Sequence, residues 1–218
     1  MNAAKDSFDS QRAGMVERQL RRRGIDDERV LAAMREVPRE FFVPEAQRRR
    51  AYADSALPIG SGQTISQPWI VAAICQALDL HGAARVLEIG TGSGYSAAVL
   101  ARLAAKVVTI ERHEELAQEA AARLRELGVP NVEVVIGDGS RGLPERAPFE
   151  AIAVHATAPE PPISLIEQLA PDGRLVVPIA SRSADMLTQY RRRDDEIVSN
   201  VIGPCRFVPL IGEEGFGA

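Results

Sequence analysis

Three alternating glycines follow an acidic residue in the segment VLEIGTGSGY, which covers residues 86–95. Gly90, Gly92 and Gly94 are of the type that lets a backbone approach a ligand closely where a strand turns into a helix. A dinucleotide fingerprint starting at Gly90 would place its third glycine at position 95, where the chain has Tyr95. The spacing therefore disfavours NAD and favours a different adenosyl ligand.

Acidic residues further along the chain can complete a nucleoside site. Glu111 ends VVTIE, 21 residues after Gly90 (111 − 90), where a carboxylate can accept hydrogen bonds from both ribose hydroxyls. Asp138 and Gly139 follow VEVVI, and Asp138 can accept from the exocyclic amine of adenine. Each of these residues also has a simpler structural interpretation: a salt-bridged strand residue for Glu88, a helix N-terminal carboxylate for Glu111, and a turn for Asp138–Gly139. Their occurrence at three consecutive predicted strand ends favours a single nucleoside site.

The elements that must position these residues are short β-branched runs alternating with helical stretches. The predicted strands cover residues 85–89, 106–110, 132–136, 151–154 and 174–179. Strand–helix–strand repetition predicts a parallel sheet with crossover helices, the clearest of which ends at Gly128. Two further runs, near residues 186–193 and 196–202, have no long helix between them and predict an antiparallel hairpin at the sheet edge.

The first third of the chain predicts a helical lead-in. Residues 28–37 have helical apolar spacing up to Pro38, residues 38–44 read as an irregular packing segment, and residues 57–68 read as a loop. An apolar helix is expected over 69–80, with Ser66 as a candidate N-cap.

Composition excludes several classes of protein. With 218 residues, 45% hydrophobic and 26% charged, the chain is neither disordered nor a disulfide scaffold. Its net charge of −4 disfavours a nucleic-acid partner, and no apolar run reaches the roughly 18 residues needed to span a membrane. Cys75 and Cys205 have no partners at metal-ligand spacing, so we expect no metal and a cytoplasmic chain. His81, His113 and the arginine triplets read as solvated side chains.

The segments LPIGSGQTISQPWIVA, FEAIAVHATAP and GPCRFVPLIG, together with VLEIGTGSGY, give the chain a resemblance to protein-L-isoaspartate O-methyltransferases over nearly its whole length. The resemblance implies that Ser66 is the active-site serine, with Thr64 and Ser61 also at the substrate. The residues that it places around S-adenosyl-L-methionine are Ile65, Glu88, Gly90, Thr91, Gly92, Gly94, Glu111, Arg112, Asp138 and Gly139. Two positions depart from the family pattern: Ser61 stands where His is common, and His155 stands in a stretch of small residues or Thr.

The expected fold is therefore a Rossmann-like class I methyltransferase fold: a mostly parallel sheet with an antiparallel edge and a helical N-terminal elaboration. We expect one domain over 1–218, with a lead-in and substrate loop at 1–84, a cofactor-binding core at 85–180, and edge strands and a C-terminal segment at 181–218.

The activity implied by the resemblance is methylation of the free carboxylate of L-isoaspartyl residues in damaged proteins and peptides, with D-aspartyl residues left open. A carboxylate is ionised at neutral pH, so its attack on a sulfonium methyl group needs no general base. Two alternatives remain: a carboxyl methyltransferase for a small acid or a specific modified peptide, suggested by Ser61 and His155, and a non-catalytic nucleoside-binding protein.

Overall fold

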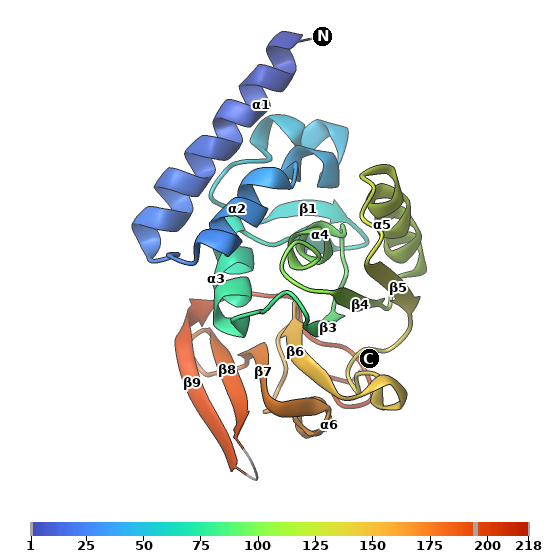
Figure 1. The fold of residues 1–218 in the computed structure, drawn as a ribbon. Coiled ribbons are helices and arrows are strands. Elements are labelled where there is room, and N and C mark those ends of the chain that lie inside the picture. The colour runs from blue at the N-terminus through green and yellow to red at the C-terminus, as the bar shows by residue number, and fades with distance from the viewer. Residues whose placement is uncertain (1, 194–195, 218) are drawn as a thin grey trace.

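The computed structural model describes residues 2–193 and 196–217, and a seven-stranded sheet lies at the centre of this part of the chain (Figure 1). The strand order is β5-β4-β3-β6-β7-β8-β9. The strands are β3 (Arg85–Ile89), β4 (Lys106–Glu111), β5 (Val132–Ile136), β6 (Phe149–Val154), β7 (Leu169–Ile179), β8 (Asp185–Arg193) and β9 (Glu196–Cys205). Strands β3 to β7 pair in parallel, and β8 and β9 add antiparallel to β7 and to each other. The predicted parallel sheet with an antiparallel edge is confirmed.

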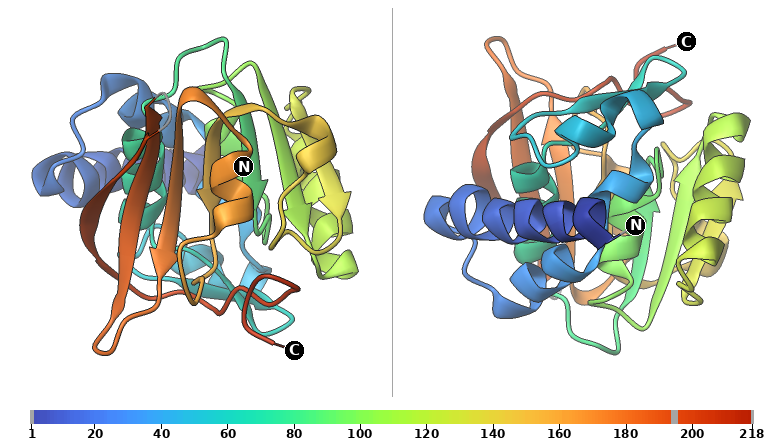
Figure 2. Two further views of the ribbon diagram at one scale, coloured as in Figure 1. Left: turned by 90° about the horizontal axis from the view of Figure 1, so that it is seen from below. Right: turned by 90° about the horizontal axis from the view of Figure 1, so that it is seen from above.

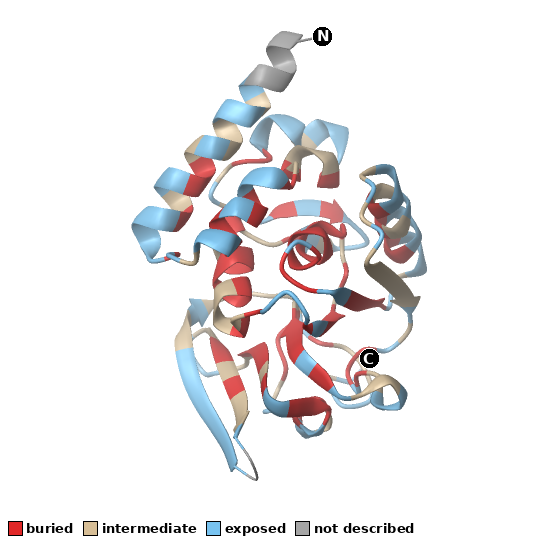
Figure 3. Cartoon of the chain, in the orientation of Figure 1, coloured by how far each residue is buried: buried red, intermediate tan, exposed pale blue. Residues whose placement is uncertain are grey.

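The central strands are nearly continuous apolar runs because both faces of the sheet are covered. Val86 faces a core cluster shared with the N-terminal helices, and its neighbour Leu87 faces a second cluster on the opposite side of the sheet. Buried residues are concentrated along these strands and the helix faces packed on them (Figure 3). This double cover leaves only the ends of the strands open to a ligand.

Four helices, one before β3 and three between later strands, pack on the sheet. They are α3 (Pro68–Leu78), α4 (Tyr95–Leu100), α5 (Glu114–Glu126) and α6 (Ile163–Glu167). In α5 the residues Leu116, Ala120 and Leu124 are buried, and the chain leaves the helix through Gly128 at φ 66°. The predicted crossover helix and its glycine stop are confirmed.

The lead-in is helical, as predicted, and lies against α3 (Figure 1). It consists of α1 (Asn2–Met15), a π-helical turn (Val16–Leu20), a 3-10 turn (Arg21–Arg23) and α2 (Glu28–Glu36). The carboxylate of Asp27 caps α2 by accepting from the backbone N–H of Arg29 at 2.8 Å. No helix in the described ranges, 2–193 and 196–217, is long and apolar enough to cross a membrane.

Two segments differ from the sequence prediction. Residues 57–68, read as a loop, contain an antiparallel hairpin of β1 (Leu57–Gly60) and β2 (Gln63–Ile65). Its turn residues Ser61 and Gly62 both have positive φ, 49° and 70°, which is the conformation that two-residue hairpin turns require. The alternation of buried Leu57 and Ile59 with exposed neighbours follows from this pairing.

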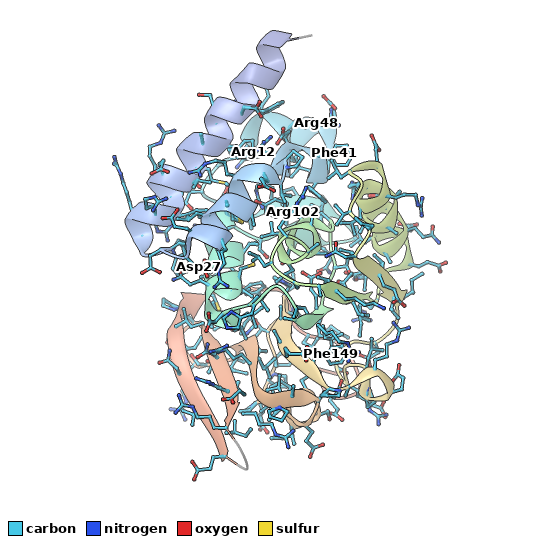
Figure 4. All side chains as sticks on the ribbon, viewed as in Figure 1. Arg12, Asp27, Phe41, Arg48, Arg102 and Phe149 are labelled. Carbon is cyan, nitrogen blue, oxygen red and sulfur yellow. The ribbon has the colours of Figure 1, made fainter. Side chains whose placement is uncertain are left out.

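The segment 38–44 is a 3-10 turn over Arg39–Phe42, followed by a second one over Glu45–Arg50. Arg39 is 0% exposed, which the sequence did not indicate because arginine is rarely buried unpaired. In contrast, Arg48 points outward and pairs with Glu45 at the surface, as expected for a solvated triplet (Figure 4).

Candidate active site

A cavity of about 270 Å³ lies at the carboxyl ends of β3, β4 and β6. Its floor is the β3–α4 turn, including Gly90 to Ser93, and the end of β4. Residues 62–66 of the β1–β2 hairpin and its exit form one wall, and residues 207–211 of the C-terminal segment form another. The crevice outside the strand ends is where open α/β sheets bind their ligands.

Glu111 fastens the floor of this cavity. Its Oε2 accepts from the backbone N–H of Gly92 at 2.9 Å, and its Oε1 accepts from that of His113 at 2.9 Å. A carboxylate offers about four lone-pair positions, so both oxygens retain acceptor capacity for a ligand. The side chain is buried at the cavity edge, which suits the predicted acceptance of ribose hydroxyls.

Glu88 lies beneath the cavity and is fully buried. Its Oε2 accepts from the hydroxyl of Thr109 at 2.6 Å, and the Thr109 oxygen is 2.6 Å from that of Thr91. Because the single hydroxyl proton of Thr109 goes to Glu88, Thr91 must be the donor in the second contact. The carboxylate thus orients a cavity residue, Thr91, without itself lining the cavity.

His155 joins this network from the end of β6. Its Nε2 lies 3.2 Å from Glu88 Oε1 and 2.9 Å from the hydroxyl of Ser96. Ser, His and Glu are therefore adjacent, but a hydrolytic triad needs the carboxylate on one ring nitrogen and the serine on the other. Here both contacts converge on Nε2, and Nδ1 is buried without a partner among the described residues. The arrangement is a structural network and not a nucleophile–base pair.

Ser66 lies on the cavity wall, between β2 and α3. The interpretation of Ser66 as a helix cap is wrong: the N-cap of α3 is Gln67, and no side chain caps that end. No hydrogen bond within the described part of the chain involves the Ser66 hydroxyl, and Arg39 contacts the Ser66 carbonyl instead. It is therefore available to a ligand in the cavity.

A buried cation holds the backbone at Ser66. Arg39 donates from Nη2 to the Ser66 carbonyl at 2.7 Å and from Nε to the Ala51 carbonyl at 2.8 Å. Its guanidinium carbon lies 4.8 Å from the centre of the Tyr95 ring. Burial lowers the pKa of Arg39, and burial also raises the pKa of Tyr95 to about 12. The contacts fix Ser66 through its carbonyl and leave the hydroxyl free.

Most of the predicted site residues meet at the cavity. Those that line it are Thr64, Ile65, Ser66, Gly90, Thr91, Gly92, Glu111, Arg112 and Gly139. Those that do not line it are Ser61, Glu88, Gly94 and Asp138. Ser61 lies in the exposed hairpin turn and Glu88 lies beneath the floor, while Gly94 packs against α5, where an added Cβ would meet Ala120 at 3.2 Å. Asp138 Oδ2 accepts from the backbone N–H of Glu213 at 2.8 Å, so its carboxylate contacts the C-terminal segment.

Sequence reasoning missed several lining residues. His113, read as solvated, lies in the cavity wall because it follows Glu111 at the end of β4. Phe207 to Ile211 also line the cavity, although they follow β9, which lies at the edge of the sheet away from β3 and β4. Arg112 contributes an exposed cationic side chain to the same wall. No group of three or more His, Cys, Asp or Glu side chains that could hold a metal ion occurs within 2–193 and 196–217.

Known proteins of one family resemble this chain. The sequence model of the family described as protein-L-isoaspartate(D-aspartate) O-methyltransferase (PCMT) matches residues 10–215. Protein-L-isoaspartate O-methyltransferase 1 of Rhodopseudomonas palustris (strain HaA2) is 56% identical over 214 residues, covering 97% of this chain and 87% of the relative.

Solved structures agree with the sequence comparisons. A protein-L-isoaspartate O-methyltransferase superposes with a TM-score of 0.84 at 31% identity, over 94% of this chain and 67% of that one. A candidate enzyme of the same name from Plasmodium falciparum, in complex with S-adenosyl-L-homocysteine, superposes with a TM-score of 0.80 at 26% identity, over 92% of this chain and 98% of that one. The expected Rossmann-like class I methyltransferase fold is confirmed, and the chain belongs to the protein-L-isoaspartate(D-aspartate) O-methyltransferase family.

Proposed function

We propose that the chain transfers the methyl group of S-adenosyl-L-methionine to the free carboxylate of L-isoaspartyl residues in damaged proteins and peptides. The observation that carries this proposal is that Ser66 and Glu111 line one cavity in a member of this family. The Ser66 hydroxyl has no partner among residues 2–193 and 196–217, and Glu111 has spare acceptor capacity. One faces the acceptor side and the other the nucleoside side. The repair role implied by the family is part of the same proposal.

The residues at the cavity floor fit S-adenosylmethionine. Glu111 provides a carboxylate for the two ribose hydroxyls, and Gly90 and Gly92, at φ 92° and 52°, bring bare backbone to the cavity. Ile89 and Ile110 add apolar surface for a purine ring. When bound, the cofactor supplies an electrophilic methyl group on sulfur.

The acceptor carboxylate needs orientation more than activation. It is ionised at neutral pH, so no side chain has to remove a proton from it. We assign its orientation to the Ser66 hydroxyl, which is held in place because Arg39 and the start of α3 fix the backbone on both sides. Arg112, exposed at the same cavity, attracts a negative acceptor.

Exclusion of water assists the transfer. A negative carboxylate and a positive sulfonium lose charge as they react, so a cavity with fewer waters favours the transition state relative to the separated ions. The walls at Ile65, His155 and Phe207 reduce access of water to the floor. Thr64 lies beside Ser66 as a second candidate contact for the peptide.

Two coarser expectations belong to the same proposal. We place the enzyme in the cytoplasm, since Cys75 and Cys205 are both unpaired thiols. We also propose peptide segments, and not nucleic acid, as its partners, in line with the net charge of −4.

Repair of a defined peptide tests the function. A synthetic isoaspartyl peptide incubated with the enzyme and S-adenosylmethionine should convert progressively to its aspartyl form, because the methyl ester collapses to a succinimide that hydrolyses in part to aspartate. Chromatography of the two isomers against time follows the conversion. An isoaspartyl peptide that stays unchanged while a small carboxylic acid is methylated would favour the small-acid alternative.

A further inference from the structure

The C-terminal strap, defined as residues 207–214, forms a wall of the cavity and is fastened at two places. The first fastening is to the end of β6: Thr157 donates to the carbonyl of Val208 at 2.8 Å, and Leu210 donates to the carbonyl of Thr157 at 2.8 Å. In two opposite views, from below and from above, the strap runs beside the β1–β2 hairpin, which carries another wall of the cavity (Figure 2). The strap therefore belongs to the acceptor side of the cavity.

The second fastening is to the turn after β5. Asp138 Oδ2 accepts from the backbone N–H of Glu213 at 2.8 Å, and the hydroxyl oxygen of Ser140 accepts from that of Glu214 at 3.0 Å. Ser140 is fully buried, so bulk water cannot replace the hydrogen bond that its hydroxyl oxygen accepts from the strap. Asp138 Oδ1 accepts from the N–H of Ser140 at 2.8 Å, which orients the carboxylate toward the strap.

The fit at this fastening leaves no space for a side chain on the strap. A Cβ added at Gly212 would lie 2.1 Å from Asp138 Oδ1 and 2.5 Å from Ser140 Oγ. Both atoms are held by the hydrogen bonds just described, so such a Cβ would push the strap away. The surface pair between Arg141 and Glu213 is exposed on both sides and adds little to this fastening.

The turn that holds the strap also contributes to the nucleoside side. Gly139, between the two fastening residues, lines the cavity floor. An added Cβ on Gly139 would lie 2.7 Å from Ile89 Cγ2, so the turn packs tightly against β3. This close packing gives the strap a rigid point of attachment on the cofactor-binding part of the sheet.

We propose that Asp138 and Ser140 are positioning residues that hold the C-terminal strap as the acceptor-side wall of the cavity. The proposal rests on the proposed methyl transfer to peptides. This role differs from the role predicted for Asp138 at the adenine amine. Loss of the acceptor wall should raise the KM for the peptide, whereas loss of a contact to adenine should raise the Kd for the cofactor.

Gly212→Ala separates the two roles without changing Asp138. We expect the KM for an isoaspartyl peptide to rise about tenfold or more, the scale of one lost charge-assisted hydrogen bond, with kcat at saturating peptide retained. The Kd for S-adenosylhomocysteine, measured by calorimetry, should change less than about twofold. Gly217→Ala is the matched control, since an added Cβ there meets nothing within 4 Å.

Hydrogen exchange gives a readout that does not depend on turnover. The amides of Glu213 and Glu214 should be protected in the unaltered protein and exchange faster in Gly212→Ala. Ser140→Ala, which removes one acceptor and adds no atoms, should move exchange and KM in the same direction by less. If Gly212→Ala does not fold, the Ser140→Ala comparison carries the test.

Three results would overturn the proposal. One is rapid exchange of both amides in the unaltered protein, another is faster exchange in the variant with an unchanged KM, and the third is a loss of cofactor affinity as large as the rise in KM. Failure of the unaltered protein to methylate the peptide would instead reject the proposed function, and the exchange data would still decide whether Asp138 and Ser140 hold the strap.

Discussion

Replacing Glu111 with Ala should weaken cofactor binding and leave the fold largely intact. The carboxylate accepts two backbone N–H groups and retains lone pairs for two ribose hydroxyls. Hydrogen bonds to a charged group contribute about 1.5–3 kcal/mol in total when partly buried, which corresponds to roughly a 10- to 100-fold rise in Kd. Calorimetric titration with S-adenosylhomocysteine measures this change directly, with the exposed Glu115→Ala as control.

A double-mutant cycle separates ribose binding from the fastening of the glycine turn. Glu111 also holds Gly92, so its loss could weaken binding by moving the cavity floor. An analogue of S-adenosylhomocysteine that lacks the ribose 2′-hydroxyl should bind the unaltered protein less tightly than S-adenosylhomocysteine does. The Glu111→Ala protein should bind the analogue and S-adenosylhomocysteine with the same affinity. The coupling energy from the four titrations isolates the contact between the carboxylate and the hydroxyl.

The cycle has a clear negative result. If removing the hydroxyl weakens binding equally in both proteins, Glu111 acts only on the turn and the ribose assignment is wrong. If affinity in Glu111→Ala equals that of the unaltered protein, Glu111 is not part of the site.

Three other predictions follow from the site. Ser66→Ala should change the free energy of unfolding by less than about 0.5 kcal/mol, because Ser66 is not a helix cap, while kcat/KM for the isoaspartyl peptide falls roughly 10- to 100-fold; normal turnover would remove Ser66 from the reaction. His155→Ala should lower the free energy of unfolding by about 1–3 kcal/mol in urea titrations, since it removes the hydrogen-bond partner of the Ser96 hydroxyl and the imidazole that lies 3.2 Å from buried Glu88. The exposed His81→Ala should have little effect, and equal effects would contradict the network. Burial tends to raise the pKa of Asp138, but hydrogen bonds from the backbone N–H groups of Glu213 and Ser140 lower this pKa overall. The contribution of the Asp138 carboxylate to stability should therefore be constant at neutral pH and disappear as the pH falls below about 4. The difference in unfolding free energy between the unaltered protein and Asp138→Asn, measured against pH, should shrink in that range, and a growing difference would contradict the fastening.

Much of the fold could be predicted because its periodicities are strong. The β-branched runs, the apolar face of α5 and its stop at Gly128 identify parallel strands and crossover helices without tertiary information. The β1–β2 hairpin was missed although Ser61–Gly62 between apolar positions is a turn signal. Its strands are only four and three residues long, too short for a pattern to outweigh the Gly, Ser and Pro content.

The site was predictable where strand ends carry it and not where distant segments complete it. Glu111 and the glycine turn follow strands, so topology alone brings them to one edge. Arg39 holds the Ser66 carbonyl and the strap lines the cavity, although the two lie toward opposite ends of the chain, and nothing local in their sequences marks these contacts. Asp138 shows the limit most clearly, because its position at a strand end was correct as a prediction while its carboxylate contacts Glu213, 75 residues away.

Labelled methyl transfer to twin peptides tests the central claim most directly. Two synthetic peptides of one sequence, differing only in an isoaspartyl or an aspartyl linkage, are incubated with the enzyme and methyl-labelled S-adenosylmethionine. We expect label on the isoaspartyl peptide as a base-labile ester, and none above background on its aspartyl twin. Equal labelling of the two peptides, label that resists base, or no label on either would contradict the proposed activity.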